Sequence, residues 1–302
     1  MNRRLVKHGE ATLMVSLPAR WLREKNLGKG DEISVEEENE KLILTSSKLI
    51  ASKKIKKINL KDSSEYMSRL LFMNYVRGYD EIHIRFEDLD VLKSIRTDAE
   101  ELIGFEIFQE SENLCILKNI AKEIETEFDP ILRNLVNLIE EQATKSLQYL
   151  GEKNFEKLEK LKILGRLSNK YCWFCLRITN NKKYVNDNLT ASEMYTIVWY
   201  MEQISDVYSR FCAAVPSLKK NYKIKADVLK YYGMVISLFK LCSKIYYHPK
   251  ANNLILEFRR ELENIKKIQK SIISADYLNS YILLEVSQVV ILIDHLSVLL
   301  YT

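Results

Sequence analysis

Basic side chains near the start of the chain are the groups best suited to bind phosphate. The first 30 residues hold seven lysines and arginines against two acids, Glu10 and Glu24. Cationic side chains neutralise nucleic-acid phosphates and release their counterions. We predict that this segment contacts DNA; the alternative is a solvated basic face on a module that only dimerises. The side chains expected to contact phosphates are Arg3, Arg4, Lys7, Arg20 and Arg23.

Side chains that catalyse reactions are scattered along the chain. His8, His83, His248 and His295 have no partner at catalytic or metal-binding spacing. The sequence also has no glycine-rich loop that could hold a nucleotide phosphate. We therefore predict that the protein is not an enzyme.

The basic residues lie on a short pattern of strand, helix and strand. Leu5, Leu13, Val15 and Leu17 occupy odd positions, which predicts a hairpin with one apolar face. A short helix is expected from Pro18, followed by a Gly-Asp turn and a second hairpin with an acidic tip at residues 36–40. Hairpins this small bury too little surface to be stable alone, so a second chain must cover them.

Several residues in this segment also carry a family resemblance. Gly9, Ser16-Leu17-Pro18, Trp21 and Gly30-Asp31-Glu32 resemble the consensus of the AbrB/SpoVT/MazE swapped-hairpin domain. That resemblance implies an obligate dimer that binds DNA. Because two-fold symmetry would double the basic patch, the resemblance and the charges point to the same function.

Composition limits the remaining classes. The 302 residues suggest two or three domains, and the net charge of +5 is too small to indicate a nucleic-acid role by itself. Cysteines are odd in number and lie in apolar stretches, so we expect buried thiols in a reducing cytoplasm. The most apolar stretch, 289–300, is interrupted by Asp294 and His295 and is too short to span a bilayer, so no membrane insertion is expected.

The rest of the chain divides into a mixed segment and a helical half. Short apolar runs alternate with amphipathic stretches between residues 55 and 118, which predicts a small α/β domain. From Ile120 onward six helical stretches follow, including one that covers 155–178, and they repeat with a period of about 85 residues. We read them as two three-helix bundles side by side. Aromatic residues of these helices, Trp199 among them, are expected in the core.

The helical half looks like PhoU, a regulator of phosphate uptake built from two three-helix bundles. The complete arrangement resembles the archaeal phosphate uptake regulator family. Two local strings carry that resemblance: residues 103–107, Ile-Gly-Phe-Glu-Ile, and residues 200–206, Tyr-Met-Glu-Gln-Ile-Ser-Asp.

Carboxylates one helical turn apart are the PhoU pattern for binding metal, and Glu202 and Asp206 fit it. The matching positions on the facing helix hold Gly165 and Asn169, and Glu285 has no acid four residues later, so the site looks eroded. No cofactor is expected beyond a weakly bound divalent metal; the alternative is that the pair only forms hydrogen bonds or faces solvent.

Taken together, the sequence predicts a multidomain α+β protein. The expected parts are a swapped-hairpin domain at 1–48, an α/β domain at 49–120 and a PhoU-like pair of bundles at 121–216 and 217–302. The expected function is a cytoplasmic homodimer that regulates phosphate uptake or phosphate-responsive transcription. The helical half would sense an ion or contact a phosphate-transport ATPase or a signalling partner. One alternative is an adaptor that docks on a transport ATPase or kinase without binding DNA. Another is an antitoxin-type regulator, which the long helical half disfavours.

Overall fold

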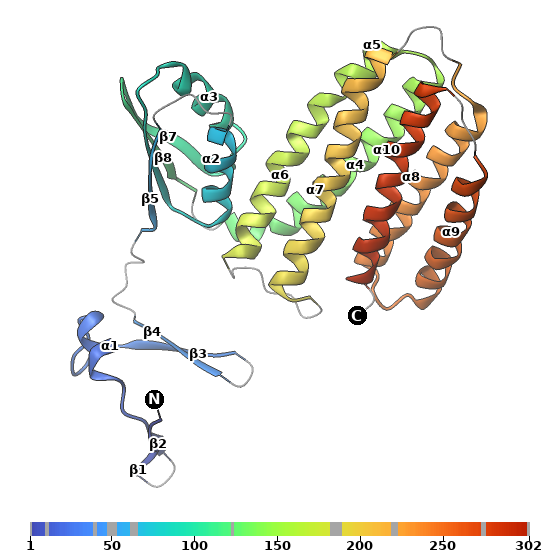
Figure 1. The fold of residues 1–302 in the computed structure, drawn as a ribbon. Coiled ribbons are helices and arrows are strands. Elements are labelled where there is room, and N and C mark those ends of the chain that lie inside the picture. Colours follow the sequence, from blue (N-terminus) through green and yellow to red (C-terminus); the bar gives the residue numbers. More distant parts are fainter. Residues whose placement is uncertain are drawn as a thin grey trace. The chain divides into compact units, whose positions relative to one another are not determined.

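The fold is described from a computed structural model of residues 1–302. The structure describes residues 2–9, 12–38, 41–46, 53–60, 66–121, 124–181, 189–218, 223–272 and 276–300. The chain divides into two compact units, residues 1–53 and 54–302, and each is treated by itself. Figure 1 shows the elements of both units.

The described part of the N-terminal unit contains two hairpins and one short helix. Strands β1 (Val6–His8) and β2 (Thr12–Met14) pair antiparallel, as do β3 (Ile33–Glu38) and β4 (Lys41–Ser46). Helix α1 (Ala19–Glu24) lies between them in sequence, with Pro18 as its N-cap residue. The two hairpins form separate two-stranded sheets (Figure 1). The predicted order of hairpin, helix and hairpin is confirmed.

The second unit opens with an α/β layer. Its mixed sheet has the order β5-β6-β8-β7, in which only β5 and β6 run parallel. Helices α2 and α3 cover one face of this sheet (Figure 1). The elements are β5 (Ile55–Asn59), α2 (Tyr66–Val76), β6 (Glu81–Arg85), α3 (Asp90–Ala99), β7 (Phe105–Ser111) and β8 (Leu114–Asn119).

Among its described residues, the rest of the unit holds seven α-helices. Helices α4, α6 and α7 pack as one group and α8, α9 and α10 as another, and α4 with α8 and α7 with α10 join the groups. The bounds are η1 (Ile124–Glu127), α4 (Phe128–Gly151), α5 (Phe155–Lys160), α6 (Lys162–Asn180), α7 (Ala191–Ala214), η2 (Val215–Leu218), α8 (Ala226–Tyr247), α9 (Asn252–Ser271) and α10 (Tyr277–Val298).

Two details of the helical half differ from the sequence prediction. The single helix expected at 155–178 is interrupted at Leu161, where α5 ends and α6 begins. Leu161 itself is buried, so the interruption keeps an apolar side chain in the core. Trp199, expected in the core, is 41% exposed. Ile197, Val198 and Met201 occupy the buried positions of that turn, and the helical period leaves Trp199 on its exposed side.

Among the described residues, α10 is the one helix long and apolar enough to cross a membrane by length and composition. Its most apolar window has a mean hydropathy of 1.6, and 44% of that window is buried inside the helical half. The apolar helix is longer than the stretch considered from the sequence because it begins at Tyr277. A buried core helix meets the same criteria, so the absence of membrane insertion stays a prediction.

Candidate nucleic-acid interface

The first hairpin places one predicted contact on a strand and two just before it. Arg3 and Arg4 precede β1, and Lys7 lies within it, directly across from Leu13. All three residues are exposed. Cross-strand partners share a face, so Lys7 lies on the face that also carries Leu13. The segment before β1 and β1 itself therefore place three exposed cations close together in the sequence.

The helix α1 places the other two predicted contacts. Arg20 and Arg23 are exposed on this six-residue helix, and the Arg20 Nε donates to the Glu24 carboxylate over 2.7 Å. The turn after α1 is closed by Asp31, whose Oδ2 accepts a hydrogen bond from the Gly28 amide over 2.6 Å. The Glu24 carboxylate therefore partly neutralises the charge of Arg20.

The apolar side chains of this unit are exposed in the single chain. Leu13 is 61% exposed. The other exposed apolar residues lie on both hairpins, and in the first hairpin they occupy both faces. They include Leu5, Val6, Met14, Val15, Val35, Leu42 and Ile43. The prediction of one apolar face is therefore wrong for this hairpin, because Val6 and Met14 form a cross-strand pair on the opposite face from Leu13. Such surfaces gain stability when another chain covers them.

One chain does not gather the five basic residues into a single packed surface. Across the described residues of the unit, only the strands of each hairpin pack extensively on one another, and Ser46 is the one buried side chain. A continuous phosphate-binding surface would need further packing between these elements. A second chain can supply it.

Comparison with known families supports this description. Residues 9–52 match the family model described as Antidote-toxin recognition MazE, bacterial antitoxin. No curated protein and no solved structure matches the chain. Residues 9–52 are thus similar to a MazE/AbrB-type domain, and domains of this type typically dimerise and bind DNA. This domain indicates a regulator of the DNA-binding or antitoxin type.

The carboxylate pair of α7 lies inside the helical half. Glu202 is 6% exposed and Asp206 is half-buried. Burial and the neighbouring Asp206 raise the pKa of Glu202 to about 7, although a hydrogen bond from Gln203 opposes the shift. Burial also raises the pKa of Asp206, and Arg210 opposes that shift. Glu202 therefore lies in a partly desolvated position.

The facing helix α6 adds no further carboxylate to this pair. Cys172 is fully buried close enough for Glu202 and Asp206 to raise its pKa, after the larger effect of burial. Gly165 lies against Ser209, whose Oγ would be 2.0 Å from an added Cβ. Among the described residues, no group of three or more His, Cys, Asp or Glu side chains could hold a metal ion. A metal site at Glu202 and Asp206 stays a prediction.

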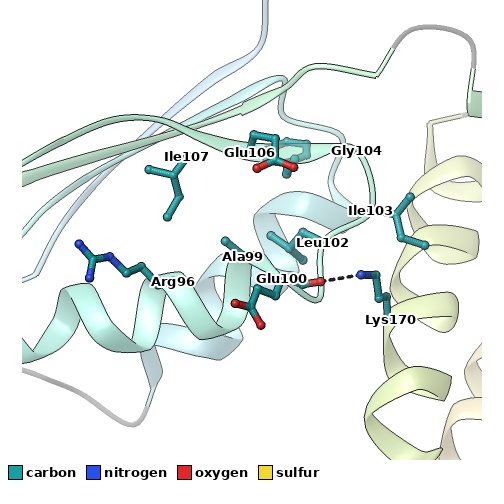
Figure 2. A pocket seen from close by; sticks show the side chains of 10 residues that line it. Arg96, Ala99, Glu100, Leu102, Ile103, Gly104, Glu106, Ile107 and Lys170 are labelled. Atoms are coloured by element: carbon teal, nitrogen blue, oxygen red, sulfur yellow. Dashed lines mark hydrogen bonds between the residues drawn. The ribbon is translucent and has the colours of Figure 1, made fainter.

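A hollow of about 570 Å³ lies where the α/β layer faces α6 (Figure 2). Lys170 reaches from α6 to donate to the Glu100 carbonyl over 2.7 Å, as Figure 2 shows. Arg96 on α3 forms an ion pair with Glu110 on β7. The two basic side chains of the hollow are thus engaged by the protein.

Sequence reasoning missed Arg177, which joins the two layers of the second unit. Arg177 is buried on α6 and donates to carbonyl oxygens of the α/β layer. An arginine inside the apolar run 172–178 was the signal that could have identified it, because a buried guanidinium must find acceptors.

Proposed function

We propose that the protein is a cytoplasmic, non-enzymatic homodimeric regulator that binds DNA through its N-terminal unit. One observation carries the proposal: exposed basic residues lie on and beside the small hairpins that carry the exposed apolar residues. A second copy covers the apolar surface and doubles the number of cations. The match of residues 9–52 to the MazE family supports both steps.

The charge distribution supports DNA over a dimerisation role alone. Arg3, Arg4 and Lys7 lie close together in the sequence, on β1 and the segment just before it. In the dimer this cluster occurs twice, related by two-fold symmetry. Operators bound by symmetric dimers carry repeated half-sites, so we expect an inverted-repeat sequence.

The helical half acts, in this proposal, as the sensing or partner-binding part. Its two groups of three packed helices support the resemblance to PhoU, and on that basis the regulated process is phosphate uptake or phosphate-responsive transcription. A transport ATPase or a signalling protein is the corresponding partner. The family match favours a second candidate, an antitoxin-type regulator that pairs with a toxin.

Selection of genomic fragments by the purified full-length protein tests the proposal. We expect a common inverted repeat among the recovered fragments, and its loss in the double variant Arg3→Ala, Arg4→Ala. The double variant Lys240→Ala, Lys244→Ala, which removes two exposed lysines of α8, serves as the matched control and should recover the same fragments. Promoters of phosphate-transport genes would support the phosphate role, and the protein's own promoter beside a toxin gene would support the antitoxin role. Recovery of no enriched sequence would contradict DNA-dependent regulation and favour the adaptor.

A further inference from the structure

The exposed face of α10 carries no formally charged residue at neutral pH. Seven side chains of this helix are exposed: Tyr277, Ser280, Leu284, Gln288, Ile291, His295 and Val298. The neighbouring helix α9 exposes Glu257, Arg259, Arg260, Glu263, Lys267 and Lys270 on its solvent side. A long solvent-facing helix normally has charges on its outer face. The face of α10 is therefore suited to contact with another protein surface, and we call these seven residues the α10 stripe.

The large apolar residues of the stripe follow a strict spacing. Tyr277, Leu284, Ile291 and Val298 recur every seven residues, and Leu284 is 64% exposed. A seven-residue repeat drifts only about 20° per repeat around a helix, so the four side chains stay on one face. Repeats of this kind pack against another helix at a shallow angle. The partner surface is therefore a helix.

We propose that the α10 stripe packs against the same stripe of a second copy, antiparallel, about a two-fold axis near Gln288. Tyr277 and Val298 lie equally far from the midpoint between residues 287 and 288, and so do Leu284 and Ile291. In an antiparallel pair each large apolar residue then meets a large apolar residue of the other chain.

The charges that border the stripe also fit a second copy. Arg210 lies 3.8 Å from Glu285, and Lys266 lies 3.0 Å from Asp294. Arg210 also donates to Gln288 of the stripe over 3.3 Å. Because each border cation lies beside an acid, like-charge repulsion between two copies is reduced. A helix that rests on an anionic membrane instead has a border rich in lysine and arginine. The other side of α10 packs against α7 and α8, so the helix cannot enter a bilayer without leaving the bundle.

This contact rests on the proposed N-terminal dimer, which keeps two copies together. Seven residue steps separate Ser46 from Lys53, a span of at most about 25 Å. Tethered surfaces meet at effective concentrations on the order of millimolar, so a helix pair too small to dimerise alone can form. The stripe would then hold the two second units in one defined arrangement.

Disulfide cross-linking of the full-length protein tests the inference, because the five native cysteines are buried. Gln288→Cys should form a covalent dimer under mild oxidation, and so should the double variant Tyr277→Cys, Val298→Cys. Tyr277→Cys alone should not form one, because residue 277 of one chain lies far from residue 277 of the other in the antiparallel pair. Leu256→Cys, an equally exposed position on α9, is the matched control and should remain uncross-linked.

Light scattering on the same samples separates the two proposals. A dimer that shows no Gln288→Cys cross-link would overturn the α10 contact and leave the N-terminal dimer intact. A monomer would overturn both. Adding Leu284→Arg should reduce cross-linking at least about tenfold, whereas Leu256→Arg should not change it. Binding to phosphatidylglycerol vesicles that Leu284→Arg abolishes would also overturn the inference, because the stripe would then serve a membrane.

Discussion

The Arg177 guanidinium donates from Nη1 to the carbonyl oxygen of Tyr75 over 2.5 Å and joins α6 to the end of α2. The same nitrogen donates to the Tyr79 carbonyl over 3.1 Å, and Asn180 donates to the Val76 carbonyl over 3.0 Å. The last carbonyl groups of a helix have no partner within it. Side chains of α6 therefore donate hydrogen bonds to the carbonyl groups at the end of α2, and these bonds hold the α/β layer on the helical half.

Arg177→Ala should destabilise the second unit by about 3 kcal/mol, because it leaves buried carbonyl oxygens without donors. Its guanidinium also lies 4.9 Å from the centre of the Tyr75 ring, a contact that is lost too. Lys170→Ala, which removes one exposed contact between the same layers, should cost under about 1 kcal/mol. Urea unfolding measures both changes, and equal stability of the two variants would contradict this role of Arg177.

Leu13→Asp should weaken the dimer, since an acidic side chain would be placed in the apolar surface that the second chain covers. We expect the dissociation constant of the full-length protein to rise at least about a hundredfold, measured by analytical ultracentrifugation. Leu256→Asp makes the same change at a position on α9 that is 67% exposed, and it should leave the dimer unchanged. If both variants remain dimeric, the N-terminal surface does not hold the chains together.

The order of hairpin, helix and hairpin in the N-terminal unit was predicted from local sequence, and further local signals mark the ends of elements in the second unit. The capping box at Thr190 and Glu193 marks the start of α7, where the Glu193 amide donates to the Thr190 hydroxyl. Gly78 ends the turn after α2 with a φ of +75°, a left-handed conformation that favours glycine. These features depend on neighbours in the sequence or on backbone conformation.

Features that depend on distant contacts were not predicted. Leu161 interrupts a helix although its own turn has no proline or glycine, and Trp199 is exposed although it is the largest apolar residue of its helix. The basic residues of the candidate interface could be named from composition. Whether they form one surface could not be predicted, because that surface depends on a second chain.

Glu202→Gln should remove a pH dependence of stability. The folded-state pKa of Glu202, about 7, lies above its ordinary value. The contribution of this side chain to the free energy of unfolding is therefore fully present at low pH and is lost as the pH rises through 7. The neutral variant should therefore be more stable than the wild type by about 2–3 kcal/mol near pH 8 and similar below about pH 5. Glu156→Gln removes a carboxylate from an exposed pair with Lys160, and in urea unfolding its stability relative to the wild type should not change with pH in this way. A constant difference between wild type and Glu202→Gln at all pH values would contradict the assignment.

The purified protein should contain well under one iron, manganese or zinc ion per chain by elemental analysis. Glu202 and Asp206 supply too few oxygen ligands for ions that take about six. Glu156 and Glu159, the nearest acids on the chain before α6, pair with Lys160 and Lys162 on the surface. A stoichiometric, chelator-resistant metal that Glu202→Gln removes would contradict this prediction.

The salt dependence of DNA affinity tests the central claim most directly. Fluorescence anisotropy with a labelled duplex measures the affinity between about 50 and 200 mM salt. The logarithm of the association constant falls with the logarithm of the salt concentration, with a slope of about 0.9 per phosphate neutralised. The wild type should lose affinity steeply over that range. Arg3→Ala, Arg4→Ala should flatten the slope by about 3 to 4, because the dimer loses four cations. Lys240→Ala, Lys244→Ala should keep the wild-type slope. An affinity that is insensitive to salt, or a slope that the two arginine substitutions leave unchanged, would contradict DNA binding by the N-terminal unit.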